Sequence, residues 1–97
     1  MSAENEFVAQ SPRVMQGERI LPTLLTLWSQ ALANVQVGAD DSFFDIGGDS
    51  LRAMRVASGV RREFGVVLSL GNFFEYDTAR RQAAHIESLL EKRSGKD

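Results

Sequence analysis

The chain has 97 residues, of which 43% are hydrophobic and 25% are charged, and these values fit one small globular domain with a modest core. The net charge of −2 is too close to neutral for a protein that holds nucleic acid or a membrane surface by a strong electrostatic field. The absence of cysteine excludes disulfides and thiolate chemistry, and it is compatible with the reducing cytoplasm, where we expect the chain.

The N-terminal segment mixes polar and apolar residues without a period and contains the turn signal Ser11-Pro12. We therefore expect a flexible arm over residues 1–18, a folded domain over 19–92 and a tail over 93–97. The first ten residues lack the basic start and apolar run of an export signal, and no window approaches the roughly 18 apolar residues of a membrane helix.

A first amphipathic helix is predicted from Ile20, because apolar residues then recur at three- and four-residue spacing. Pro22 suits its first turn, where a missing N–H costs nothing. The helix should end near Val37-Gly38, since glycine is favoured just past a helix end. Its apolar stripe, which places Trp28 in the core, consists of Leu21, Leu24, Leu25, Trp28, Ala31, Leu32 and Val35.

The loop that follows has an unusual apolar density in Phe43, Phe44 and Ile46, which predicts that it folds back over the core. Gly47-Gly48 permits backbone angles that other residues avoid, and Asp49 or Ser50 is a good N-cap, so a second helix is predicted to open at the serine. Gly65 should end this helix. Its inward stripe is Ala53, Val56, Ala57, Val60 and Phe64.

The predicted elements between the second helix and the last helix are short. Residues 66–68 could form a strand, but no partner run exists, so an extended linker is predicted. A short turn around residues 72–76 precedes a last helix, capped by Asp77 or Thr78, whose apolar residues are Ala83, Ala84, Ile86, Leu89 and Leu90. Three long helices, one short helix and no paired strands predict an all-α bundle.

Ser50 is the candidate functional residue. Two glycines in front of it let another protein approach its hydroxyl, and the positive end of the helix dipole favours a phosphate ester on that oxygen. A serine that merely caps the helix would be worth about 1 kcal/mol. The double glycine and the flanking aromatic residues favour the covalent site.

Residues 41–51 read Asp-Ser-Phe-Phe-Asp-Ile-Gly-Gly-Asp-Ser-Leu, which resembles the phosphopantetheine attachment motif of peptidyl carrier (thiolation) domains of nonribosomal peptide synthetases, in the acyl carrier protein-like superfamily. The resemblance covers roughly residues 20–90. It includes Leu25-x-x-Trp28, Val37-Gly38-x-Asp40-Asp41, Arg62-x-Phe64-Gly65-Val66 and Phe73-Phe74-Glu75.

This resemblance implies a four-helix bundle whose Ser50, in a motif with Gly47, Gly48 and Asp49, receives 4′-phosphopantetheine from coenzyme A. The thiol of that arm would carry amino-acyl or peptidyl groups as thioesters. The implied partners are a phosphopantetheinyl transferase, which supplies Mg²⁺ and coenzyme A, an adenylating enzyme, and condensing or tailoring enzymes. The chain itself would be a monomeric carrier without a catalytic or metal site, and would bind neither nucleic acid nor membrane.

Two departures from the family pattern bear on this expectation. Asp49 stands where many members have His. The resulting Gly-Gly-Asp-Ser resembles carriers that serve epimerization domains, but Asp is also usual in polyketide and fatty-acid carriers, so an acyl carrier protein of that type is the alternative. Downstream, the sequence has Tyr76-Asp77-Thr78 where family members commonly have Pro-Thr before the last helix. This difference puts a partner contact in doubt, but not the fold.

Three other kinds of protein or site match parts of the sequence less well than a carrier domain does. Residues 48–51 match the nucleophile motif of Gly-Asp-Ser-Leu hydrolases, but His85, the only histidine, has Gln82 three residues before it where those enzymes place Asp, and the chain is too short for their fold. A calcium loop from Asp45 would require Gly and Glu where Ser50 and Val56 stand. A DNA-binding helix is disfavoured by the net negative charge.

The helix at Ser50 also suggests how partners dock. With its inward stripe already filled, Leu51, Met54 and Arg55, with Ser58 beyond, should flank an exposed strip beside the arm. A flexible methionine suits a surface that accepts several partners in turn. The alternative is that the two apolar residues are the edge of the core.

Overall fold

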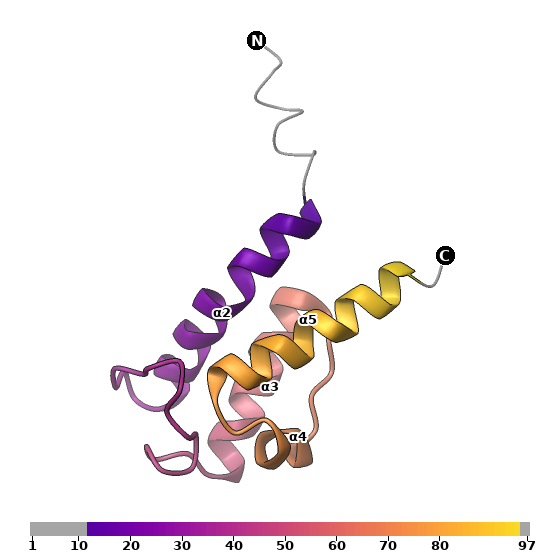
Figure 1. Ribbon diagram of the computed structural model, residues 1–97. Helices are drawn as coiled ribbons and strands as arrows, with labels where there is room; N and C mark the ends of the chain where they lie inside the picture. The colour runs from indigo at the N-terminus through magenta and orange to yellow at the C-terminus, as the bar shows by residue number, and fades with distance from the viewer. Residues whose placement is uncertain (1–11, 96–97) are drawn as a thin grey trace.

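The computed structural model describes residues 12–95, and the side chains of residues 19–92. This part of the chain contains four helices, α2 (Pro12–Ala31), α3 (Ser50–Phe64), α4 (Leu70–Glu75) and α5 (Ala79–Gly95). Helix α2 packs against both α3 and α5, and the short α4 contacts α3 at one end of the bundle (Figure 1). The prediction of an all-α bundle with three long helices and one short helix is confirmed.

The start of α2 differs from the prediction. The helix begins at Pro12 and not at Ile20, so Pro22 lies inside it instead of in its first turn. Residues 12–18 of the predicted arm are therefore helical, and residues 1–11 lie outside the described residues. The sequence places the start at Ile20 because the apolar period becomes regular only there.

The end of α2 also lies earlier than predicted. The helix stops at Ala31, and Ala33 and Asn34 then adopt positive φ angles of 64° and 66°. The N–H of Asn34 donates to the carbonyl of Ser29 at 2.6 Å, which closes the helix end. Val35 continued the apolar spacing in the sequence, but it lies beyond the helix and is 39% exposed.

The core lies where α2, α3 and α5 meet. Trp28 is fully buried, which confirms its predicted place, and its ring contacts Phe43 edge-on with the centroids 4.8 Å apart. Phe43 comes from the loop and also contacts Phe73 of α4, at 5.2 Å. The loop therefore folds back over the core as predicted, and it joins α2 to α4 through one buried ring.

Local hydrogen bonds account for the ends of the other helices. Asp49 is the N-cap of α3, and Gly65 ends that helix in the left-handed region at φ 71°. The five residues predicted as the inward stripe of α3 are all buried. Helix α4 begins at Leu70, within a capping box made by Ser69 and Asn72, and so starts earlier than the predicted turn.

The linker and the last helix follow the predicted order. Val66 and Leu68 of the linker are buried while Val67 between them is 72% exposed, as in an extended segment. Thr78 caps α5, since its Oγ1 accepts the N–H of Arg81 at 3.1 Å. Ala84 is exposed, although it belongs to the predicted apolar set. Along the described residues, no helix is both long and apolar enough to cross a membrane.

Gln82 of α5 is a buried polar residue that the sequence did not predict. It is completely buried, and its Oε1 accepts the indole N–H of Trp28 at 3.1 Å. Its Nε2 has no hydrogen-bond partner among the described residues. The signal was present in the spacing, because Gln82 precedes Ile86 by one helical turn and so shares its inward face.

Candidate functional site

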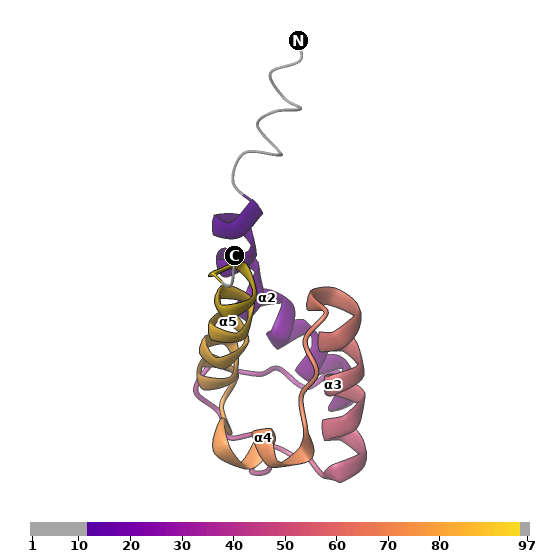
Figure 2. The same cartoon turned by 90° about the vertical axis from the view of Figure 1, so that its right-hand side faces the viewer.

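Ser50 is the first residue of α3, and it is exposed to solvent. Figure 2 shows that the start of α3 lies at the same end of the bundle as α4. The backbone N–H groups of the first helical turn point toward this end, where the helix dipole favours negative charge. The position confirms the prediction that a helix opens at this serine.

Asp49, not Ser50, caps the helix. Its backbone is extended, and its carboxylate accepts the backbone N–H of Arg52 at 2.8 Å and the Arg52 guanidinium at 2.8 Å. The backbone hydrogen bond from Arg52, followed by the charge of its side chain, lowers the pKa of Asp49. The hydroxyl of Ser50 has no hydrogen-bond partner among the described residues, so it is free of the capping role.

Glycine is favoured at positions 47 and 48, before the serine, for two different structural reasons. Gly47 has a φ of 109°, which side chains rarely tolerate, and a Cβ added there would meet nothing within 4 Å. At Gly48 an added Cβ would lie 2.3 Å from the ring of Phe43 and 2.6 Å from its carbonyl oxygen. Gly47 thus adjoins open space, whereas the space at Gly48 is filled by the core ring of Phe43.

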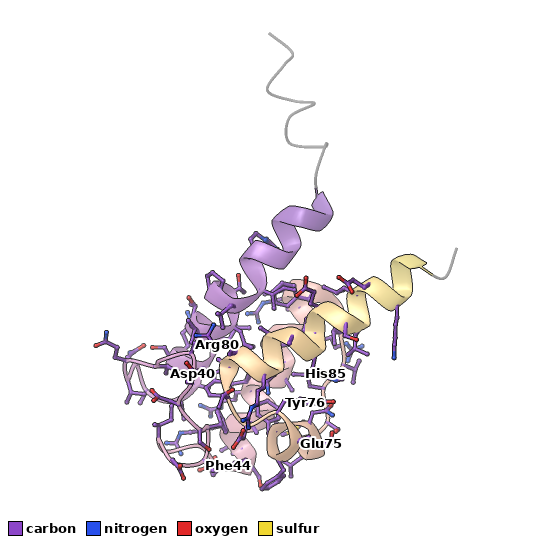
Figure 3. All side chains as sticks on the ribbon, viewed as in Figure 1. Asp40, Phe44, Glu75, Tyr76, Arg80 and His85 are labelled. Atoms are coloured by element: carbon purple, nitrogen blue, oxygen red, sulfur yellow. The ribbon has the colours of Figure 1, made fainter. Side chains whose placement is uncertain are left out.

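The loop that presents Ser50 is fastened to the start of α5. The N–H of Phe43 donates to the carbonyl of Asp77 at 2.8 Å, and the N–H of Arg80 donates to the carbonyl of Ala39 at 2.9 Å. The guanidinium of Arg80 also donates hydrogen bonds to both carboxylate oxygens of Asp40, at 2.9 and 3.3 Å (Figure 3). The hydrogen bond from Arg80 lowers the pKa of Asp40.

The residues predicted to flank the serine are exposed. Leu51 is 64% exposed and Met54 47%, and Arg55 and Ser58 also face solvent. Neither apolar residue is among those buried in the core or packed against it. Whether partners bind this strip stays a prediction.

Sequence reasoning missed a further apolar residue at this end of the molecule. Phe74 of α4 is 64% exposed and stacks on Phe44 of the loop, with ring centroids 4.6 Å apart and planes 13° from parallel. The available signal was the pair Phe73-Phe74, because a one-turn helix can bury only one of two adjacent aromatic side chains.

The histidine required by a hydrolase lies elsewhere. His85 of α5 is half-buried and stacks on Tyr76, with centroids 4.2 Å apart (Figure 3). It lines a hollow of about 530 Å³ with Glu75, Arg81 and Ser88. Within the described residues it makes no hydrogen bond to Ser50, and no group of three or more His, Asp or Glu side chains there could hold a metal ion.

Comparison with known families gives a match over most of the bundle. The sequence model described as "Phosphopantetheine attachment site" matches residues 22–86. The dimodular nonribosomal peptide synthase of Bacillus subtilis is 41% identical over 78 residues, which is 80% of this chain and 3% of that protein. Tyrocidine synthase 3 of Brevibacillus parabrevis is 48% identical over 64 residues, 66% of this chain and 1% of that protein. The chain thus spans a small fraction of these relatives.

Solved structures resemble the whole bundle. A chain in the complex of the phosphopantetheine transferase Sfp with coenzyme A and a peptidyl carrier protein is 35% identical, with a TM-score of 0.68 over 71% of this chain and 90% of that one. An active-site mutant of a peptidyl carrier protein is 34% identical, with a TM-score of 0.68 over 72% and 78% of the two chains. BlmI, a type-II acyl carrier protein from Streptomyces verticillus, shares the fold at 21% identity, with a TM-score of 0.72 over 78% and 92% of the two chains.

Proposed function

The chain belongs to the family of phosphopantetheine attachment domains that includes the peptidyl carrier proteins, and on this premise we propose that Ser50 holds the arm and that the chain carries intermediates of nonribosomal peptide synthesis. The cofactor is a covalently attached 4′-phosphopantetheine derived from coenzyme A. Its terminal thiol supplies the thioester chemistry.

The free hydroxyl of Ser50 is the observation that carries this proposal. A serine at a helix start usually serves as the cap, but here the carboxylate of Asp49 accepts the capping hydrogen bond. The Ser50 oxygen can therefore be esterified without the loss of the hydrogen bond that caps α3. The open space at Gly47 admits a transferase, and the first turn of α3 favours the phosphate charge.

The chain acts in this proposal as a substrate of other enzymes. A phosphopantetheinyl transferase attaches the arm, an adenylating enzyme loads it, and condensing or tailoring enzymes use the thioester. The two peptide synthetases compared above are 41% and 48% identical to this chain, which favours amino-acyl and peptidyl cargo. The alternative, an acyl carrier of polyketide type, has the support of Asp49 and of PksN of Bacillus subtilis, a polyketide synthase 35% identical over 80 residues, 82% of this chain and 2% of that protein.

Intact mass spectrometry tests the attachment residue. Incubation of the full chain with Sfp, coenzyme A and Mg²⁺ should add one phosphopantetheine group to the wild type and none to Ser50→Ala. Ser88→Ala, which removes an exposed hydroxyl on α5, is the matched control and should be modified fully. An adduct on a folded Ser50→Ala protein, or a wild type that never gains the group, would contradict the assignment.

A further inference from the structure

We infer that the exposed side of α3 docks an acidic segment of a partner protein, with apolar contact beside Ser50 and ion pairs farther along the helix. This inference rests on the proposed function, because it assumes that partners approach Ser50. The surface, which we call the basic ridge, comprises Arg55, Arg61 and Arg62.

The arginines of the basic ridge lack the close carboxylate partners that three other arginines have. Arg52, Arg80 and Arg81 each contact a carboxylate, at 2.8, 2.9 and 3.0 Å. Among the described residues, Arg55 and Arg61 have no carboxylate partner, and the contact of Arg62 with the adjacent Glu63 is 3.6 Å long. The ridge is therefore a local positive surface on a chain whose net charge is −2.

Hollows on both sides of α3 combine these charges with apolar walls. One hollow of about 170 Å³ lies between α2 and α3, where Arg55 and Arg62 stand beside Leu27 and Gly59. A second of similar volume lies between α3 and the linker, where Arg61 stands beside exposed Met54 and Val67. An apolar side chain can thus enter each hollow while a neighbouring carboxylate meets a guanidinium.

Gly59 lies on the wall of the first hollow. A Cβ at this position would lie 2.6 Å from Cδ2 of Leu27, so a larger residue would require the end of the Leu27 side chain to move. The close approach brings Gln30 and Ala31 of α2 beside the two arginines. The hollow is thus a consequence of helix packing in the core and does not depend on a mobile loop.

The loop before Ser50 carries the opposite charge. The carboxylate of Asp45 in the loop is exposed and has no partner among the described residues. Along the sequence, Ser50 therefore lies between an unpaired negative charge and the basic ridge. A partner must match both signs, which selects one orientation on the surface; exposed charges of this kind govern association rate and register more than affinity.

The expected ligand follows from the helix dimensions. Met54 and Arg61 are separated by seven residues, which is about 10 Å along the axis. A helical segment with a leucine and glutamates one to two turns apart fits this spacing. The matched probes are two synthetic helical peptides that are identical except for four Glu in one and four Lys in the other.

Titration of the isotope-labelled full chain, with the arm attached, tests the inference by NMR. At low salt the Glu peptide should shift the amide signals of residues 54–62 and bind at least tenfold more tightly than the Lys peptide, and 0.3 M salt should weaken it. The variant Arg55→Glu, Arg61→Glu, Arg62→Glu should reverse the preference. If the Glu variant does not fold, the variant with Gln at the same three positions should abolish the preference for the Glu peptide.

Lys92→Glu, which reverses an exposed charge on α5, is the control and should retain the preference for the Glu peptide. Equal binding of both peptides, shifts confined to other helices, or equally tight binding of a short single-stranded DNA would overturn the inference. The intact mass of the same samples separates this outcome from failure of the proposed function, because Ser50 would still carry its arm.

Discussion

The indole N–H of Trp28 and the amide of Gln82 meet inside an otherwise apolar core. The hydrogen bond joins α2 to α5, yet Nε2 of Gln82 has no partner among the described residues. A buried polar group without a partner costs about 1–3 kcal/mol, whereas replacing both partners by apolar groups can be nearly neutral. The pair therefore links two helices at the cost of one unsatisfied donor.

A double-mutant cycle measures this balance. Gln82→Leu should lower the free energy of unfolding by about 1–3 kcal/mol, because it leaves the Trp28 N–H without an acceptor. Trp28→Phe should also destabilise, through the orphaned Oε1 of Gln82 and the lost ring volume. The double variant should lose less than the sum of the two, as measured by urea unfolding. Additive losses would show that the hydrogen bond does not couple the two residues.

At this scale the sequence predicted which residues matter better than why they matter. Ser50 was found because glycine, a cap and a helix start are local features. The reason for Gly48 could not be found in the same way, since it depends on Phe43 turning back against it in three dimensions. The burial of Gln82 was missed because polarity is a poor guide when a specific partner, Trp28, supplies the hydrogen bond.

At the scale of elements, α3 has one buried face and one exposed face, and we predict that stability depends on the first and recognition on the second. Met54→Ala or Arg55→Glu should leave the unfolding temperature nearly unchanged, because both side chains are exposed, but should slow arm attachment or loading. Val60→Ala, on the fully buried face, should instead destabilise by about 1–3 kcal/mol with little effect on these rates. Calorimetry and single-turnover assays of the three proteins distinguish the faces. Unchanged rates at both exposed positions would argue against docking on this helix.

The loop between α2 and α3 is fastened to α5 by the pair of Asp40 and Arg80. Because the pKa of Asp40 is lowered in the folded chain, its contribution to stability is present above the ordinary carboxyl range and is lost as the pH falls through the lowered pKa. Asp40→Asn should therefore lower the unfolding temperature slightly near pH 7, and the difference from wild type should shrink below about pH 4.

Thermal unfolding across this pH range checks the prediction, with Asp45→Asn as the control, since Asp45 lies in the same loop without a partner among the described residues. A difference between wild type and Asp40→Asn that grows toward low pH would contradict the assigned sign. Both residues are exposed, so the pair holds the loop in register and contributes little to total stability.

Element order was predictable because apolar period and glycine positions are local, but the ends of α2 were not. The stop at Ala31 depends on two successive left-handed residues, Ala33 and Asn34, of which alanine gives no sequence signal. The start at Pro12 lies eight residues before Ile20, where the apolar period becomes regular. Only the contacts of the folded bundle define these boundaries.

At the scale of the whole molecule, the described core occupies less of the chain than the helices do. Every described buried residue lies between Ile20 and Ile86, while α2 and α5 continue to Pro12 and Gly95. The family match covers a similar span, residues 22–86. Beyond Ile86, Leu89 and Leu90 of α5 are partly buried and pack against this core.

A fragment of residues 19–92 should therefore fold cooperatively and accept the arm at the rate of the full chain. It retains the described core, the loop fastening to α5 and the free hydroxyl of Ser50. Calorimetry and intact mass after incubation with Sfp would test both properties, with the full chain as reference. A fragment that unfolds without a cooperative transition would show that residues 12–18 or 93–95 pack as part of the domain, and the boundary at residue 19 would then have to move to the start of α2.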